Sequence, residues 1–252
     1  MKKSFLLLVL FFILCIPVFA EKAANQESCS SIFSFLQPYK EISNKIWEVN
    51  KLKSEQSKLS KSEKETISKY VFGAVKGEDT FLLINSYYMG TLNKYIPAKE
   101  ITKPLEYRLE YYAKSLSAIV SKRKLPQSII LYGGLDERDV MANFSDKGIQ
   151  QALKADVNES NAEILDKKIG NKIYYQKGFM KVYYDSNYVH KSKYRLKMKA
   201  PKNMQALLLE GIGKAGAKEV LINKNQEWKI TGVETGCDRV TKEKYYLIEV
   251  KG

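Results

Sequence analysis

The spacing of apolar residues changes once along this chain, close to Lys124. Before that point apolar residues recur every three or four positions, which is the spacing of an amphipathic helix. After it, short apolar runs are separated by glycine, proline and asparagine turns, which is typical of strands. Helices followed by strands predict an α+β fold in one domain: a helical lobe over residues 21–120 and a mainly antiparallel β core over residues 121–252.

The helical lobe is predicted to hold about four helices. Its apolar period runs from Ser30 to about Tyr70, with a polar, serine-rich loop at Lys51–Lys58. Ser60 precedes Glu63 by three residues, a capping box that predicts the start of a helix there. Beyond it we predict a break and two helices: Gly73–Asp79, Phe81–Leu92 and Ile101–Val120.

The β core is predicted from runs with strand composition. These runs are Ser128–Tyr132, Lys172–Tyr175, Phe179–Tyr184, Tyr194–Lys199, Met204–Leu209, Lys218–Ile222, Gln226–Thr231 and Lys244–Lys251. The polar stretch Asp136–Lys168 contains helical fragments, and we expect it to lie exposed on the surface.

The first twenty residues have the three parts of a secretory signal peptide. Lys2 and Lys3 are basic, Phe5–Phe19 is apolar, and Val18-Phe19-Ala20 is a small-x-small cleavage site before Glu21. The apolar run is too short for a membrane anchor. We therefore expect an exported, secreted protein with no transmembrane segment after cleavage.

The few cysteines and the single histidine limit the kinds of catalytic or metal site that the chain can form. Removing the signal leaves Cys29 and Cys237, which can form a disulfide in an oxidising compartment or stay as two separate thiols. The chain has a single histidine, His190. We therefore expect neither a Ser-His-Asp triad nor a metal site.

The chain is basic, with 42 Lys and Arg against 28 Asp and Glu and a net charge of +14. Such a charge favours anionic partners. The positive residues are spread along the predicted helices and strands and form no compact run. This distribution predicts a generally basic surface, and we do not expect nucleic acid as the partner.

The stretch Tyr194–Thr231 combines a strand, a proline turn, a second strand and the glycine-rich loop Gly211–Gly216. Directly after the loop comes Glu219, at the start of another strand. This order lets a sheet present one carboxylate at the edge of a cleft. The stretch therefore predicts a site built around Glu219.

Several segments resemble the bacterial ADP-ribosyltransferase exotoxins, both the Rho-modifying exoenzymes and the enzymatic components of binary actin-modifying toxins. The matching segments, in order, are LSKSEKETISKY (59–70), INSYYMG (84–90), LPQSIILYGG (125–134), KGFMKVYY (177–184) and AGAKEVLINKNQEWKI (215–230). The last segment is the most specific, because it matches the acceptor-recognition turn and the strand that carries the catalytic glutamate.

The resemblance implies chemistry on NAD, with cleavage of the nicotinamide–ribose bond and transfer of ADP-ribose to a protein. Glu219 would be the catalytic carboxylate that stabilises an oxocarbenium-like transition state. Asn85 and Tyr132 would lie around the NAD cleft. The acceptor-recognition turn would include Gly213, Lys214, Gly216 and Ala217. No metal is implied.

The chain departs from the family pattern in three places. Gly133 stands where an arginine normally clamps the diphosphate, and Ala217 stands where a glutamate or glutamine orients the acceptor. The segment 181–183 reads Lys-Val-Tyr where the family has Ser-Thr-Ser. Lys181 could form an ion pair with Glu219, and Arg138 or Arg195 could replace the missing clamp.

Three functions stay open. The chain can be a catalytically impaired or inactive ADP-ribosyltransferase-like module that docks to a host protein or toxin partner, as a catalytically dead copy of the fold does in binary toxins. It can be an active enzyme with an unorthodox site. It can be an exported basic binder of nucleic acid or anionic surfaces. The substitutions favour the first, with the exposed loop Gly211–Gly216 as the surface that contacts the partner.

Overall fold

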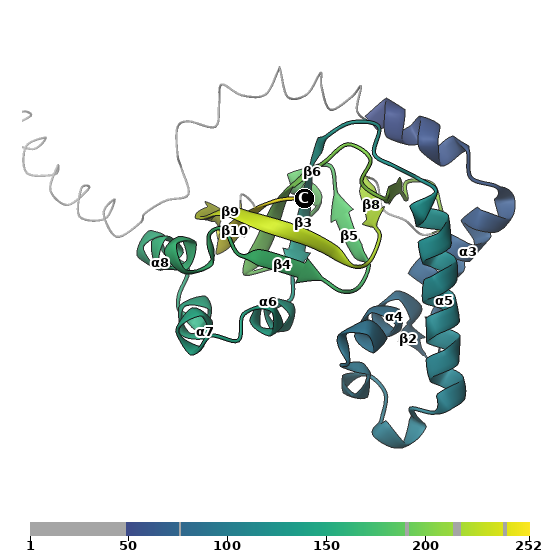
Figure 1. Ribbon diagram of the computed structural model, residues 1–252, viewed down its shortest axis with the longest axis horizontal. Helices are drawn as coiled ribbons and strands as arrows, with labels where there is room; N and C mark the ends of the chain where they lie inside the picture. The colour runs from purple at the N-terminus through teal and green to yellow at the C-terminus, as the bar shows by residue number, and fades with distance from the viewer. Residues whose placement is uncertain (1–48, 76, 190–191, 214–217, 239–240) are drawn as a thin grey trace, which may run out of the picture.

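The structure, a computed structural model, describes residues 49–252 except 76, 190–191, 214–217 and 239–240 (Figure 1). The predicted signal peptide, Cys29 and His190 lie outside the described residues, as does the side chain of Arg138. Cys237 is disulfide-bonded. Among the described residues, no helix is long and apolar enough to cross a membrane.

In the described part of the helical lobe, three helices pack together on one side of the sheet (Figure 1). They are α3 (Lys61–Phe72), α4 (Thr80–Met89) and α5 (Lys103–Ser121). The lobe also contains a short hairpin and two 3-10 turns: β1 (Ala74–Val75), β2 (Glu78–Asp79), η2 (Leu92–Lys94) and η3 (Ala98–Glu100). The predicted break at 73–79 is therefore the hairpin that joins α3 to α4.

The predicted capping box is confirmed at the start of α3. The backbone N–H of Glu63 donates to Ser60 Oγ at 3.1 Å, and Ser60 N–H donates to Glu63 Oε2 at 3.0 Å. These hydrogen bonds, with Lys122 and Arg123 nearby, hold the pKa of Glu63 below its usual value. The sequence Glu63-Lys64-Glu65 thus serves the helix start.

The predicted loop at Lys51–Lys58 is wrong, because residues 49–57 are helical. Tertiary contacts hold this polar segment in place: Leu52 is buried, Lys53 forms an ion pair with Glu210 at 3.4 Å, and Gln56 Nε2 donates to the Glu210 carbonyl. Contacts with a distant loop therefore outweigh the weak local propensity of a serine-rich sequence.

The β core is one eight-stranded sheet of order β4-β9-β10-β6-β3-β5-β8-β7. Its strands are β3 (Ile129–Leu135), β4 (Ile173–Gln176), β5 (Met180–Tyr183), β6 (Tyr194–Ala200), β7 (Ala206–Leu208), β8 (Glu219–Ile222), β9 (Gln226–Cys237) and β10 (Lys244–Lys251). Neighbouring strands are antiparallel except β10 and β6. The α+β prediction with a mainly antiparallel core is confirmed.

The prediction of an exposed surface stretch at Asp136–Lys168 is wrong. The segment forms α6 (Glu137–Asn143), α7 (Lys147–Lys154) and α8 (Glu159–Ile169), which lie beside the sheet near β9 and β4 (Figure 1). Val140, Leu153 and Leu165 are fully buried in the main core. The segment is polar on average, yet each helix buries an apolar stripe.

The two faces of the sheet have different neighbours. One face forms the main core with α6–α8 and contains the large buried side chains of Trp228, Tyr194 and Tyr246. On the opposite face, Leu207 of β7 and Leu221 of β8 join the apolar cluster of the helical lobe. The same face of the adjoining strands is polar, and it carries Glu219.

Candidate active site

A row of five paired residues crosses the polar face of the sheet, one from each of five neighbouring strands. In order along the sheet the row is Glu219, Tyr183, Tyr132, Lys197 and Glu249, from β8, β5, β3, β6 and β10. Directly paired residues of neighbouring strands point to the same side. Glu219 and Tyr132, which the sequence predicts for the site, therefore share one face.

Tyr183 is the residue that contacts the Glu219 carboxylate. Its hydroxyl donates to Glu219 Oε1 at 3.4 Å. Burial of the ring, together with the negative charge of Glu219, raises the pKa of Tyr183 to about 12. Tyr183 is therefore a neutral donor near pH 7 and helps to fix the orientation of the carboxylate.

The second oxygen of Glu219 has no such partner. Oε2 is inaccessible to solvent, and no residue in the described part of the chain donates a hydrogen bond to it. A buried carboxylate oxygen without a donor is costly unless a further group completes the site. This oxygen can accept a hydrogen bond from a hydroxyl group of a ligand once the atoms that cover it move.

Lys218, directly before Glu219, is held in place by an acidic partner. Its Nζ lies 2.6 Å from Asp185 Oδ2 and 4.5 Å from the centre of the Tyr188 ring. The hydrogen bond to Asp185 raises the pKa of the Lys218 ammonium. This contact ties the entry of β8 to the segment after β5, and it also neutralises the cation nearest to Glu219 in sequence.

The expected ion pair between Lys181 and Glu219 is not formed. Lys181 pairs with Leu221, two residues further along β8 than Glu219. Its ammonium lies 4.9 Å from the centre of the Phe81 ring and 5.7 Å from that of Phe72, both in the helical lobe. The strand register therefore places the Lys181 ammonium against aromatic rings. Lys181 does not neutralise the Glu219 carboxylate.

Gly133 lies on β3 but faces away from Glu219. A Cβ atom at Gly133 would lie 3.2 Å from Val182 Cγ1 and 4.0 Å from Met180 Sδ, on the side of the main core. An arginine here would enter packed apolar side chains. The structure thus gives no room for the clamp that the family pattern places at this position.

Arg195 does not replace that clamp. Its Nη2 lies 2.6 Å from Asp238 Oδ2, and its guanidinium is 4.0 Å from the centre of the Tyr245 ring. Arg195 is on β6, three strands from β8, which corresponds to about 14 Å at the usual strand spacing. The ion pair and the ring contact hold Arg195 away from the Glu219 carboxylate.

Asn85 joins the helical lobe to the sheet. Its Oδ1 accepts from the Phe179 N–H at 2.8 Å, and its Nδ2 donates to the Phe179 carbonyl at 3.1 Å. A Cβ atom at Gly178 would lie 2.5 Å from Asn85 Oδ1, so glycine allows this close approach. Both polar atoms of the Asn85 amide are thereby engaged with the backbone before β5.

The described part of the glycine-rich loop is packed against α3. Ile212 is buried in the helical-lobe cluster. Gly213 has φ = 59°, and a Cβ atom there would lie 2.4 Å from Ser68 Oγ. Lys214, Gly216 and Ala217, predicted for acceptor recognition, lie outside the described residues.

Sequence reasoning missed the role of Tyr183 and the ion pair at the far end of the row. Lys197 Nζ lies 2.6 Å from Glu249 Oε1, and this hydrogen bond raises the pKa of Lys197. The strict alternation of YRLKMKA and KYYLIEVK indicates that both side chains leave the core face. The pairing of these two strands, however, is not visible in either segment.

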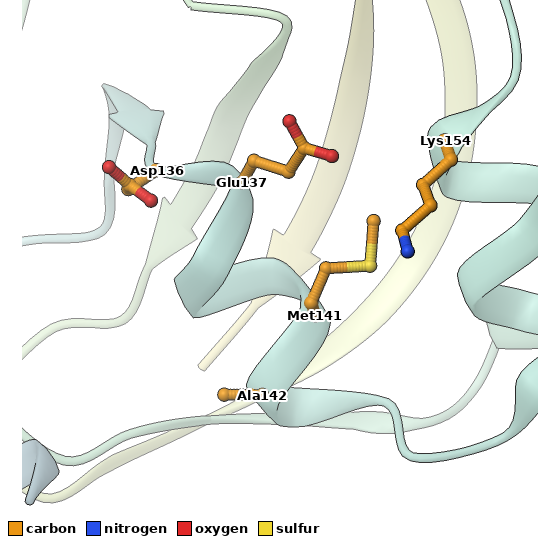
Figure 2. Close-up of a pocket in the computed structure, with 5 residues that line it drawn as sticks. All are labelled: Asp136, Glu137, Met141, Ala142 and Lys154. Atoms are coloured by element: carbon orange, nitrogen blue, oxygen red, sulfur yellow. The ribbon is translucent and has the colours of Figure 1, made fainter. Parts of the chain in front are cut away.

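A separate shallow hollow of about 730 Å³ lies beside α6 and the end of α7, lined by Asp136, Glu137, Met141, Ala142 and Lys154 (Figure 2). Figure 2 shows Glu137 and Met141 on α6, with Lys154 reaching in from α7. None of these residues belongs to the row that contains Glu219. The hollow is therefore distinct from the predicted site.

Comparison with known proteins agrees with this architecture. A sequence model of the ADP-ribosyltransferase exoenzymes matches residues 44–251. Among solved structures, BECa, an ADP-ribosylating toxin of a binary enterotoxin from C. perfringens solved with NADH, matches with a TM-score of 0.62 at 20% identity. The match covers 83% of this chain and 48% of BECa, so the chain spans about half of that protein.

Two shorter toxins match over nearly their whole length. Plx2a, an ADP-ribosyltransferase toxin from Paenibacillus larvae, has a TM-score of 0.59 at 18% identity, covering 84% of this chain and 96% of Plx2a. C3stau2 from S. aureus, solved with NAD, has a TM-score of 0.59 at 17% identity, covering 82% and 94%. At these identities the likeness shows the fold. No curated protein sequence matches the chain.

Proposed function

The chain belongs to the ADP-ribosyltransferase exoenzyme family, and we propose that it is a secreted, catalytically impaired member that acts as a binding or docking module. The expected partner is a protein, either of the host or of a toxin assembly. NAD is the ligand that the site would take if it binds one, because BECa and C3stau2 were solved with NADH and NAD. No metal takes part in this proposal.

One observation carries the proposal: no arginine is available beside Glu219 among the residues whose side chains are described. Position 133 is a glycine that faces the core, and Arg195 is held by Asp238 at 2.6 Å. A dinucleotide carries a diphosphate, and proteins usually hold such groups with charge-assisted hydrogen bonds from arginine or lysine. Without this clamp, binding and orientation of NAD would both be weak.

The acceptor side of the reaction is weakened too. Ala217 stands two residues before Glu219, and its methyl group offers no hydrogen bond to an acceptor. Transfer of ADP-ribose needs an oriented acceptor as well as a stabilised ribose cation. Glu219 alone can supply electrostatic stabilisation to the ribose. These substitutions support the interpretation that the chain keeps the catalytic glutamate and lacks the other groups that the reaction needs.

Turnover of NAD tests this proposal. The mature chain is incubated with labelled NAD, alone and with host-cell lysates, and nicotinamide release and label transfer are measured. We expect wild type and Glu219→Gln to give the same background rate. Turnover by wild type that Glu219→Gln abolishes would refute catalytic impairment.

A second candidate is an active enzyme with an unorthodox site, and one observation favours it. Glu219 Oε2 is buried without a donor, while Tyr183 holds Oε1 at 3.4 Å. An oriented carboxylate with one oxygen left over is suited to bind a ribose hydroxyl. This candidate predicts that Tyr183→Phe lowers turnover less than Glu219→Gln, since Tyr183 only positions the carboxylate.

A further inference from the structure

A second hollow, of about 330 Å³, lies within the helical lobe, where α3 ends and the β1–β2 hairpin begins. It is lined by Lys69, Gly73, Ala74, Val75, Thr80, Arg108 and Tyr112. Two of these residues are cationic and none is acidic. The hollow shares no residue with the row that contains Glu219.

The packing of α3 against α5 brings the two cations together. Arg108 and Tyr112 are four residues apart on α5 and therefore lie on the same side of the helix. The Tyr112 ring stacks on Tyr70 of α3 at 4.2 Å, and Lys69 Nζ lies 5.8 Å from the centre of each ring. The ring pair thus fixes the distance between the helices and holds Lys69 at the wall of the hollow.

Neighbouring carboxylates do not neutralise these cations. The acids of α5 have other partners: Glu106 pairs with Lys103 at 3.4 Å, and Glu110 pairs with Lys114 at 2.8 Å. Among the described residues, neither Lys69 nor Arg108 has a carboxylate within the 4.0 Å that defines an ion pair. Two positive charges therefore share one recess without an anion.

We propose that this recess is a binding site for the phosphate group of a small phosphorylated molecule. Arginine offers a planar fork of donors that matches phosphate oxygens, and lysine adds a compact charge. Thr80 also lines the recess. A volume of about 330 Å³ falls at the lower end of the ~300–1,000 Å³ of small-molecule sites. The site is independent of Glu219 and of the function proposed above.

Inorganic phosphate is the first probe, titrated into the full chain at constant ionic strength and followed by amide NMR shifts. We expect saturable shifts that include Gly73, Ala74 and Thr80. Arg108→Gln and Lys69→Gln should each weaken binding about 10-fold, the loss expected for one charge-assisted hydrogen bond. Lys99→Gln removes the same charge from an exposed position in η3, outside the recess, and should leave phosphate binding unchanged.

Two results would overturn the proposal. One is phosphate-induced shifts that are unchanged in Arg108→Gln and Lys69→Gln, since the recess would then not be the site. The other comes from cosedimentation with phosphatidylcholine vesicles that contain phosphatidic acid: binding to vesicles that requires Arg108, without saturable binding of inorganic phosphate, would assign the recess to a lipid headgroup. Unchanged amide spectra of both variants outside the recess would verify that they are folded.

Discussion

The Glu219 site and the helical-lobe recess differ in the sign of the charge that has no partner: it is negative in the first and positive in the second. Glu219 Oε2 has no donor among the described residues, while Lys218, directly before β8, and Arg195 of β6 are bound to carboxylates at 2.6 Å. In the recess two cations, Lys69 and Arg108, have no carboxylate partner among the described residues. Among the residues whose side chains are described, free positive charge therefore lies in the helical-lobe recess, and Arg195 and Lys218 near the polar face are paired.

This difference comes from strand register and helix packing, and net charge does not determine it. The chain has a net charge of +14, yet Arg195 and Lys197 of β6 are paired with the carboxylates of Asp238 and Glu249. In the lobe, the acids of α5 are engaged by lysines of the same helix, and Arg108 has no ion pair with any described residue. Three predictions test whether the contacts beside the sheet are as fixed as this comparison requires.

Breaking the Arg195–Asp238 pair should have the largest effect. Arg195 and Asp238 side chains are only 10% and 16% exposed, so Asp238→Asn leaves a nearly buried guanidinium without its charge partner. We expect a loss of about 3 kcal/mol in the free energy of unfolding, measured by urea denaturation. Glu249→Gln, which breaks the more exposed pair with Lys197, should cost at most about 1 kcal/mol.

An equal, small effect of both substitutions would show that Arg195 is not firmly held. Arg195 could then move toward the cleft, and the contrast between the two regions would weaken. Equal urea dependence of the two variants and the wild type would show that the native states remain comparable.

Asn85 should matter for stability. Asn85→Ala leaves the N–H and carbonyl of Phe179 without partners where α4 meets β5. We expect a loss of about 2 kcal/mol in the free energy of unfolding, since each unpaired buried group costs about 1–3 kcal/mol. Asn93→Ala, at an exposed position in η2, should stay within about 0.5 kcal/mol. A loss no larger than in Asn93→Ala would contradict this account of Asn85.

The smallest of the three effects is the contribution of Tyr183 to the pH dependence of stability in alkaline solution. The pKa of Tyr183 is about 12 in the folded chain and near 10 when unfolded, so the neutral phenol contributes stability below pH 10. That contribution is lost as pH rises from 10 to about 12. Urea denaturation at pH 8 and pH 11 should therefore show a smaller pH-dependent loss for Tyr183→Phe than for wild type. An identical loss would contradict the raised pKa of Tyr183, which burial of the ring and the charge of Glu219 cause.

The sequence correctly predicted those helices and strands that are determined by residues within the segment itself. The capping box at Ser60 and Glu63 starts α3 as expected, and the alternation in Lys244–Lys251 marks β10 over its full length. The helix at 49–57 could not be predicted, because contacts with Glu210, more than 150 positions away, stabilise it. The burial of α6–α8 was missed because average polarity hides one apolar stripe per helix.

Only those features of the site that depend on a single segment could be predicted from the sequence. The order of loop and strand predicted Glu219, and the resemblance to the exotoxin family added Tyr132; the structure places both on one face. The direction of Gly133 depends on its place opposite Val182, and the partner of Arg195 lies 43 positions along the chain. Pairing between distant segments decides these contacts, and single segments contain no record of it.

Titration calorimetry of NAD into the full chain tests the central claim most directly. We expect no saturable heat at millimolar NAD, with the same trace for wild type and Glu219→Gln, because no arginine among the residues whose side chains are described is available to hold the diphosphate. A saturable binding curve for wild type that is lost in Glu219→Gln would contradict it.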